Sequence, residues 1–159
     1  MSKQYYDSAS YATGNSVGYL VKRAHALNLD ALEPELAKHG LTFTQYAVLM
    51  AVRDGIALNP KDLCVQLRHD SGALTRVLDQ LESRGLIERQ RSTEDRRAIE
   101  VHLTGAGEDT LAAVVPLVVN RLNQTLKDFS HAEIDELLRL LNKLIGGWQN
   151  VLGGHEGSH

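Results

Sequence analysis

Residues 71–104 read SGALTRVLDQLESRGLIERQRSTEDRRAIEVHLT, and this stretch decides the fold. Its first part repeats apolar residues at spacings of three and four, which predicts an amphipathic helix with the stripe Leu74, Val77, Leu78 and Leu81. Gly85 follows, where glycine commonly ends a helix. The opposite face carries small, hydroxylated or cationic side chains that can approach a polyanion: Ser71, Gly72, Thr75, Arg76 and Gln80. A helix that lies in a DNA groove needs such a face.

After Gly85 the period of the pattern changes to two, which predicts two short strands over residues 86–91 and 98–103. The polar tip between them, residues 92–97, ends in Arg96 and Arg97. A charged hairpin attached to a candidate recognition helix is typical of a wing. The helix then enters the major groove, and the tip reaches the phosphate backbone or the minor groove. The alternative is a solvated, mobile hairpin tip.

This stretch resembles the MarR (multiple antibiotic resistance regulator) family of winged helix-turn-helix transcription factors. The resemblance runs from about Val17 to Leu152. In the helix and first strand it rests on Ser71, Thr75, Arg76, Asp79, Leu81, Glu82, Gly85, Leu86 and Arg89. The family's wing pattern, D-x-R followed by L-T-x-x-G, is matched by Asp95, Arg97, Leu103, Thr104 and Gly107. The resemblance implies a mainly α (α+β) fold, a winged helix-turn-helix with long N- and C-terminal dimerisation helices, in a homodimer.

Thr75 and Arg76 are the first candidates for contacts to DNA, because arginine can pair bidentately with guanine and threonine offers a hydroxyl and a methyl group. For an isolated pair of this kind the alternative is an ordinary solvated helix face. In the wing, Arg97 is expected in the minor groove and Arg96 on a phosphate. The resemblance implies that Asp95 holds the wing arginine in place. The predicted DNA-binding set is completed by Ser71, Gly72, Gln80 and Arg89.

Two helices with clear start signals precede the recognition helix. Thr42 and Gln45 have the spacing of a capping box, and Asn59-Pro60 supplies an N-cap and a first helical residue. A short turn at His69 and Asp70 then leads into the recognition helix, which makes a helix-turn-helix. Residues 56–58 are long enough only for a bridge strand, which would add a third strand to the wing sheet.

We predict one domain, residues 14–152, between a flexible arm at 1–13 and a disordered tail at 153–159. Residues 41–103 are its DNA-binding lobe, and residues 15–38 and 104–152 are its dimerisation helices. Apolar side chains on the last helix are hard to bury within one subunit, which favours a homodimer: Leu137, Leu138, Leu141, Leu144, Ile145, Trp148 and Leu152.

Composition limits the classes of function. The chain has 159 residues and a net charge of −3, although Lys61 to Arg97 holds eight Lys or Arg against seven Asp or Glu. Charge alone therefore supports a nucleic-acid partner only weakly. There is no apolar run near the length of a membrane span and no signal-peptide pattern, so we expect a cytoplasmic protein with no membrane contact.

Candidate chemistry of other kinds has little residue support. The seven histidines never pair at metal-ligand spacing, and there is no nucleophile motif or phosphate-binding glycine loop. We therefore expect no enzyme, no metal site and no cofactor. Cys64, the single cysteine, is interpreted as a small packed hydrophobe. In the alternative it makes the chain an oxidation-responsive regulator, although the family's peroxide-sensing branch keeps its cysteine near the N-terminal helix.

The resemblance also implies a signal, because family members commonly release DNA when a small aromatic or phenolic anion binds. Tyr19, Arg23, His39 and Tyr46 lie on elements that could border such a pocket, with Arg23 as a possible carboxylate partner. The alternative is that these residues pack or lie on the surface. The sequence thus predicts a ligand-released repressor on a pseudo-palindromic operator of double-stranded DNA. A dimeric interaction module without DNA binding is the rival interpretation, which the acidic net charge would explain.

Overall fold

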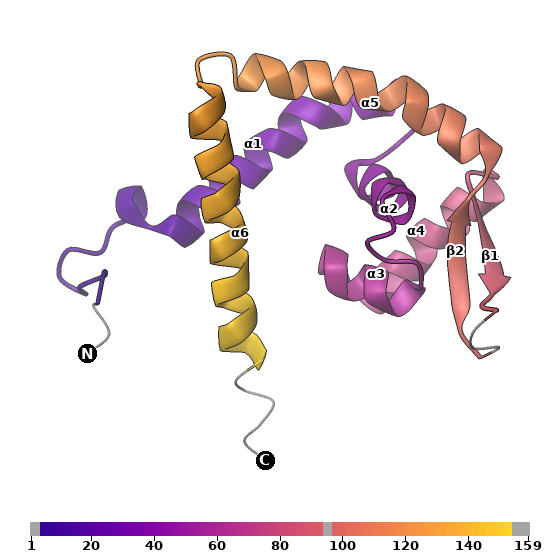
Figure 1. Ribbon diagram of the computed structural model, residues 1–159, viewed down its shortest axis with the longest axis horizontal. Helices are drawn as coiled ribbons and strands as arrows, with labels where there is room; N and C mark the ends of the chain where they lie inside the picture. The colour runs from indigo at the N-terminus through magenta and orange to yellow at the C-terminus, as the bar shows by residue number, and fades with distance from the viewer. Residues whose placement is uncertain (1–3, 94–96, 154–159) are drawn as a thin grey trace. The chain divides into compact units, whose positions relative to one another are not determined.

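The computed structural model describes residues 4–93 and 97–153 (Figure 1). Within them the helices are α1 (Val17–Ala37), α2 (Phe43–Arg53), α3 (Pro60–Leu67), α4 (Ser71–Ser83), α5 (Gly105–Thr125) and α6 (His131–Gly153), after a 3-10 turn at Thr13–Asn15. The strands are β1 (Ile87–Arg91) and β2 (Ile99–Leu103), paired antiparallel. The predicted mainly helical fold with a small winged sheet is confirmed. In the described part of the chain no helix combines the length and apolarity that a bilayer span requires.

The chain divides into two compact units, Met1–Val119 and Asn120–His159. In the first unit, α2, α3 and α4 gather beside the two strands (Figure 1). Leu74, Leu78 and Leu81 of the predicted stripe are at most 1% exposed. They join a core with leucines of α1, α2 and α3 and with Ile87 and Val101 of the strands. Because these strand residues point into the core, burial fixes the orientation of the hairpin relative to α4.

The predicted helix starts are confirmed. The Gln45 amide N–H donates to Thr42 Oγ1 at 3.2 Å, and the Thr42 amide donates to Gln45 Oε1 at 3.0 Å, which completes the capping box of α2. Asn59 Oδ1 accepts from the Asp62 amide at 2.8 Å and caps α3. After α3, Arg68 adopts a left-handed conformation with φ 52°. Asp70 is the N-cap of α4, so the turn between the two helices is only three residues long.

The third strand predicted at residues 56–58 is wrong, because the described sheet has only β1 and β2. The Val101 amide donates to the Leu58 carbonyl at 2.6 Å, so this segment contacts β2 without forming a strand. Gly55, with φ 65°, ends the turn after α2, and Asn59 already caps α3. Three residues between two such fixed points leave room for one cross-strand hydrogen bond.

The L-T-x-x-G pattern joins the start of α5 to the turn between α4 and β1. Thr104 donates its hydroxyl to the Gly85 carbonyl and accepts from the Gly107 amide at 3.1 Å. A Cβ atom at Gly107 would collide with the carbonyl oxygen of Leu86. Glycine is therefore required at position 107 for α5 to pack this closely against the lobe.

The predicted arm, residues 1–13, is described from Gln4 onward and contacts the start of α1. Tyr6 Oη accepts from the Val17 amide at 2.9 Å and donates to the Asn15 carbonyl at 3.0 Å. Tyr11 Oη lies 2.6 Å from Oγ of Ser16, the N-cap of α1. These phenol groups satisfy helix-terminal polar groups, so the described part of the arm extends the capping of α1.

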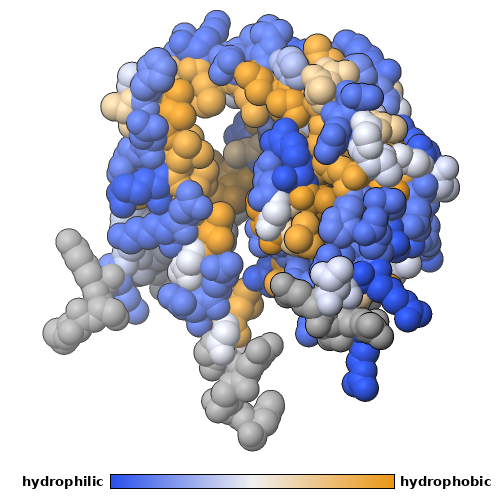
Figure 2. Space-filling view, turned by 45° about the vertical axis from the view of Figure 1, so that its right-hand side comes forward, coloured by the Kyte–Doolittle hydropathy of each residue, from blue (hydrophilic) through white to orange (hydrophobic). Residues whose placement is uncertain are grey.

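The second unit contains the end of α5 and all of α6. Ser130 and Glu133 form a second capping box, with the Ser130 amide donating to Glu133 Oε2 at 2.8 Å and the Glu133 amide to Ser130 Oγ at 3.3 Å. None of the 23 residues of α6 is buried, and most of its large apolar side chains are exposed. Figure 2 shows that hydrophobic residues reach the surface of the molecule in continuous stretches. Residues 154–159 of the predicted tail lie outside the described residues.

Candidate nucleic-acid interface and ligand pocket

The N-terminal half of α4 presents four of the predicted DNA-binding residues together. Ser71, Gly72, Thr75 and Arg76 are all exposed and recur at the spacing of one helix face. Asp70 Oδ1 accepts from the Gly72 and Ala73 amides at 2.9 and 3.0 Å, so the first turn is held by its own cap. This end of α4 is an exposed surface of the size and chemistry that a major groove admits.

Gln80, also predicted to bind DNA, makes a contact within the protein. Its Oε1 accepts from Gln45 Nε2 at 3.0 Å, and Gln45 is only 6% exposed. Both polar atoms of the Gln45 side-chain amide are engaged, because Nε2 donates to Gln80 and Oε1 closes the capping box of α2. The pair therefore ties the second half of α4 to the first turn of α2.

Arg89 is likewise occupied inside the lobe. Its guanidinium donates to Glu82 Oε2 and Asp79 Oδ1, both at 2.8 Å, and its amide N–H donates to Glu82 Oε1 at 3.2 Å. Two carboxylates neutralise its charge and join β1 to α4. We had not expected this ion pair from the sequence, although Asp79 and Glu82, three residues apart on one side of a helix, could have indicated it.

The wing places two cations beside its tip. Arg91, at the end of β1, and Arg97 are both exposed. The hairpin is closed by a hydrogen bond of 2.9 Å from the Ser92 amide to the Ala98 carbonyl. Asp95 and Arg96, predicted to hold the wing arginine and to contact phosphate, lie outside the described residues. Arg91 is a further candidate for a phosphate contact, because it is exposed and ends β1, next to the tip in sequence.

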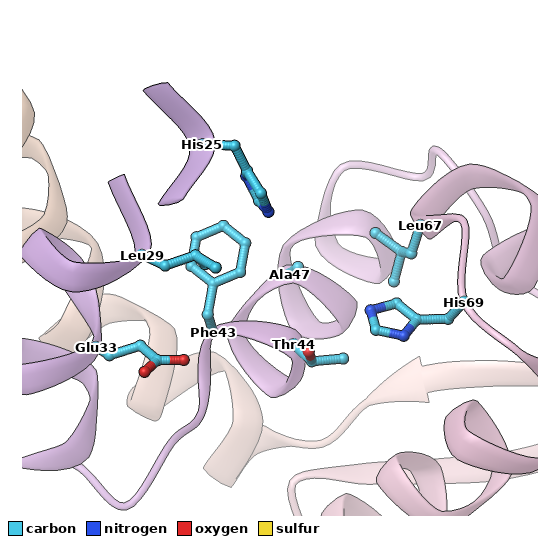
Figure 3. Close-up of a pocket in the computed structure, with 8 residues that line it drawn as sticks. All are labelled: His25, Leu29, Glu33, Phe43, Thr44, Ala47, Leu67 and His69. Atoms are coloured by element: carbon cyan, nitrogen blue, oxygen red, sulfur yellow. The ribbon is translucent and has the colours of Figure 1, made fainter. Parts of the chain in front are cut away.

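A pocket of about 260 Å³ lies in the first unit between α1, α2 and the turn that precedes α4 (Figure 3). It is lined by His25, Leu29 and Glu33 of α1, Phe43, Thr44 and Ala47 of α2, Leu67 of α3, and His69. The two imidazole rings come from opposite walls, with the carboxylate of Glu33 on a third side (Figure 3). The His25 and Phe43 rings meet edge to face, 6.1 Å between centroids. Apolar walls with a few polar groups are typical of a small-molecule site.

None of the predicted effector residues, Tyr19, Arg23, His39 and Tyr46, lines this pocket. On α1 the lining residues recur every fourth position, and Arg23 precedes His25 by two, which turns it to the other side of the helix. The Tyr46 ring packs beside Phe43, 6.4 Å between centroids, and burial raises the pKa of its phenol. The four residues therefore lie outside this cavity, and their role in binding an effector stays a prediction.

Cys64 is half-buried and packs against the hydrophobic core, as a small hydrophobe would. Among the residues that the structure describes, no group of three histidine, cysteine or carboxylate side chains could hold a metal ion.

Comparison with known proteins agrees with this geometry. Residues 39–98 match the MarR family. The chain is 35% identical over 109 residues to the HTH-type transcriptional regulator SarZ of Staphylococcus haemolyticus, which covers 69% of this chain and 71% of that protein.

Two solved structures are similar over most of the chain. A mutant MarR of Escherichia coli complexed with operator DNA has a TM-score of 0.70 and 30% identity, covering 80% of this chain and 92% of that one. BpsR of Bordetella bronchiseptica, whose DNA binding is regulated by 6-hydroxynicotinic acid, has a TM-score of 0.73 and 27% identity, covering 84% of this chain and 96% of that one.

Proposed function

The chain belongs to the MarR family of winged helix-turn-helix transcriptional regulators, and from this premise we propose that it is a repressor that binds a pseudo-palindromic operator as a homodimer. The relatives found are regulators of transcription and not enzymes. The observation that carries the proposal is the exposed face of Ser71, Gly72, Thr75 and Arg76 beside a wing with Arg91 and Arg97. We place its action in the cytoplasm, in contact with the chromosome.

The dimer is supported by the exposed apolar side of α6. Leu138, Ile145 and Trp148 are 54%, 50% and 44% exposed, and such residues in a continuous stripe destabilise a lone soluble chain. A two-fold dimer would present two α4 helices to half-sites about 34 Å apart, which is one turn of DNA.

The signal in this proposal is a small aromatic molecule bound in the pocket of about 260 Å³. The apolar walls would hold a single ring, and His25 and His69 would supply hydrogen bonds or positive charge to a carboxylate. A ligand that binds the form unable to reach both half-sites more tightly shifts the population away from the operator. Because BpsR responds to 6-hydroxynicotinic acid, hydroxylated aromatic acids are the first probes.

The proposal is tested with DNA from upstream of the chain's own gene. Fluorescence anisotropy over a range of salt concentrations should show saturable binding that weakens as salt rises. Arg76→Ala should weaken binding about tenfold or more, as loss of a bidentate base contact would. Lys38→Ala, an equal charge change on an exposed residue at the end of α1, should not. If the protein does not bind this DNA, or binds it no more tightly than unrelated duplexes, the repressor is rejected and the interaction module is favoured.

A further inference from the structure

We propose that a ligand in the pocket acts on α4 through His69, which tilts the N-terminal half of α4 about the contacts that hold its C-terminal half. This inference rests on the proposed function, because it assigns a mechanical route to the same pocket. It concerns movement inside one lobe and is independent of how two subunits are arranged.

His69 lies between the pocket and the start of α4. Its ring lines the pocket (Figure 3), and the next residue, Asp70, is the N-cap of α4. Asp70 Oδ1 holds the Gly72 and Ala73 amides, so the first turn of α4 follows any movement of residue 70. A group that presses on the His69 ring therefore presses, one residue away, on the end of α4 that is proposed to read DNA.

The other end of α4 is anchored by hydrogen bonds. Gln80 is held by Gln45 at 3.0 Å, and Arg84 donates through its Nη1 to the Gly40 carbonyl at 2.7 Å. Asp79 and Glu82 are held by Arg89. These bonds reach α2, the α1–α2 turn and β1, which places three separate supports around the second half of α4.

The length of α4 turns a small tilt at its anchored half into a larger displacement at its N-terminal end. Ser71 and Gln80 are nine residues apart, which is about 13 Å along a helix. A tilt of about 10° at Gln80 would move Ser71 by about 2 Å. Hydrogen bonds to base edges tolerate only a few tenths of an ångström, so such a tilt would break them. The opposite wall of the pocket contains Phe43 and Thr44, in the same first turn of α2 as Gln45. A ligand between this turn and His69 thus separates the two at one end while Gln45 holds Gln80 at the other.

The test fills the pocket without a ligand. Ala47 lines it from α2, and Ala47→Phe should place a ring where an aromatic ligand would lie. We expect operator affinity to fall roughly five- to 150-fold, the usual range of allosteric coupling. Ala37→Phe adds the same side chain at an exposed position at the end of α1 and should leave the affinity within about twofold. The double variant Ala47→Phe, His69→Ala should regain most of the lost affinity.

Amide NMR resonances of the full-length protein locate the movement. In Ala47→Phe the Gly72 and Ala73 signals should shift, while those of Ser83 and Arg84 stay in place. Circular dichroism checks folding, and Ala47→Leu replaces the larger side chain if Ala47→Phe does not fold. Unchanged operator affinity in a folded filled variant, or equal shifts at both ends of α4, would overturn the lever. Absence of specific operator binding by the unchanged protein would instead reject the proposed function.

Discussion

The ion pairs of Arg89 with Asp79 and Glu82 allow a quantitative prediction. The prediction distinguishes a residue that organises the DNA-binding surface from one that touches DNA. The Arg89 side chain is 25% exposed, and those of Asp79 and Glu82 are 58% and 38% exposed. Ion pairs this accessible to water contribute about 0–1 kcal/mol each. The two pairs together should contribute about 1–2 kcal/mol to the free energy of unfolding, because one guanidinium bridges both carboxylates and the Arg89 amide N–H also bonds to Glu82.

Arg89→Ala should therefore lower the melting temperature by about 3–6 °C, as expected for a chain of this size. Glu82→Ala should lower it as well, and the double variant should fall short of the sum of the two effects by about 1 kcal/mol. Thermal unfolding gives the melting temperatures and chemical denaturation gives the free energies, both monitored by circular dichroism. High salt should reduce the difference between the unchanged protein and Arg89→Ala, because it screens exposed pairs.

The same variant should leave the salt dependence of operator binding nearly unchanged. The charge of Arg89 is already balanced by two carboxylates, so it displaces few counterions from DNA. Arg76→Ala should reduce the slope of log affinity against log salt by about one. If Arg89→Ala reduced this slope as much as Arg76→Ala and left the melting temperature unchanged, Arg89 would be a phosphate contact and the reasoning from the ion pair would fail.

Three further predictions follow from packing and capping. Gly107→Ala should destabilise the protein by about 2–4 kcal/mol in thermal unfolding, because its Cβ would collide with the Leu86 carbonyl, whereas Gly105→Ala, which meets open space, should not. Hydrogen bonds from Ser130 hold the pKa of Glu133 below its usual range. This cap therefore stabilises the folded protein at pH values above the usual pKa of glutamate, and the stabilisation is lost as pH falls through the lowered pKa. Melting temperatures measured over a pH series should depend less on acid in Glu133→Gln than in the unchanged protein. Leu141→Glu, on the exposed side of α6, should shift sedimentation from dimer to monomer, and a variant that stays dimeric would place the interface elsewhere.

The sequence predicted best those features that depend on near neighbours. Periodicity located α4 and the strands, and two side chains three residues apart located the cap of α2. Each of these signals is a local physical constraint, namely burial of one face or satisfaction of free amide groups. The third strand was predicted wrongly because the pattern at residues 56–58 carries no information about the turns on either side, at Gly55 and Asn59, that confine this segment.

The candidate sites were harder to predict because their contacts join residues far apart in sequence. Gln80 and Gln45 are 35 positions apart, and no periodicity announces their hydrogen bond. For the pocket, residue type alone gave little guidance, because its lining mixes three aliphatic residues with Phe43, Thr44, Glu33 and two histidines. Which face of α1 meets α2 is a property of tertiary packing.

The internal use of carboxylates resolves the apparent conflict between an acidic chain and a DNA partner. Between Lys61 and Arg97 the charges nearly balance, yet three of the acidic residues have partners within the lobe. Asp70 is bound to the first amides of α4, and Asp79 and Glu82 are bound to Arg89. Arg89 balances one of the two charges of Asp79 and Glu82, and the Asp70 carboxylate faces the positive end of the α4 dipole, whereas Arg76 and Arg91 stand on the exposed surface. The potential near the proposed DNA-binding face is set by these exposed arginines more than by the net charge of −3, because exposed charges beyond about 8 Å are largely screened at physiological salt.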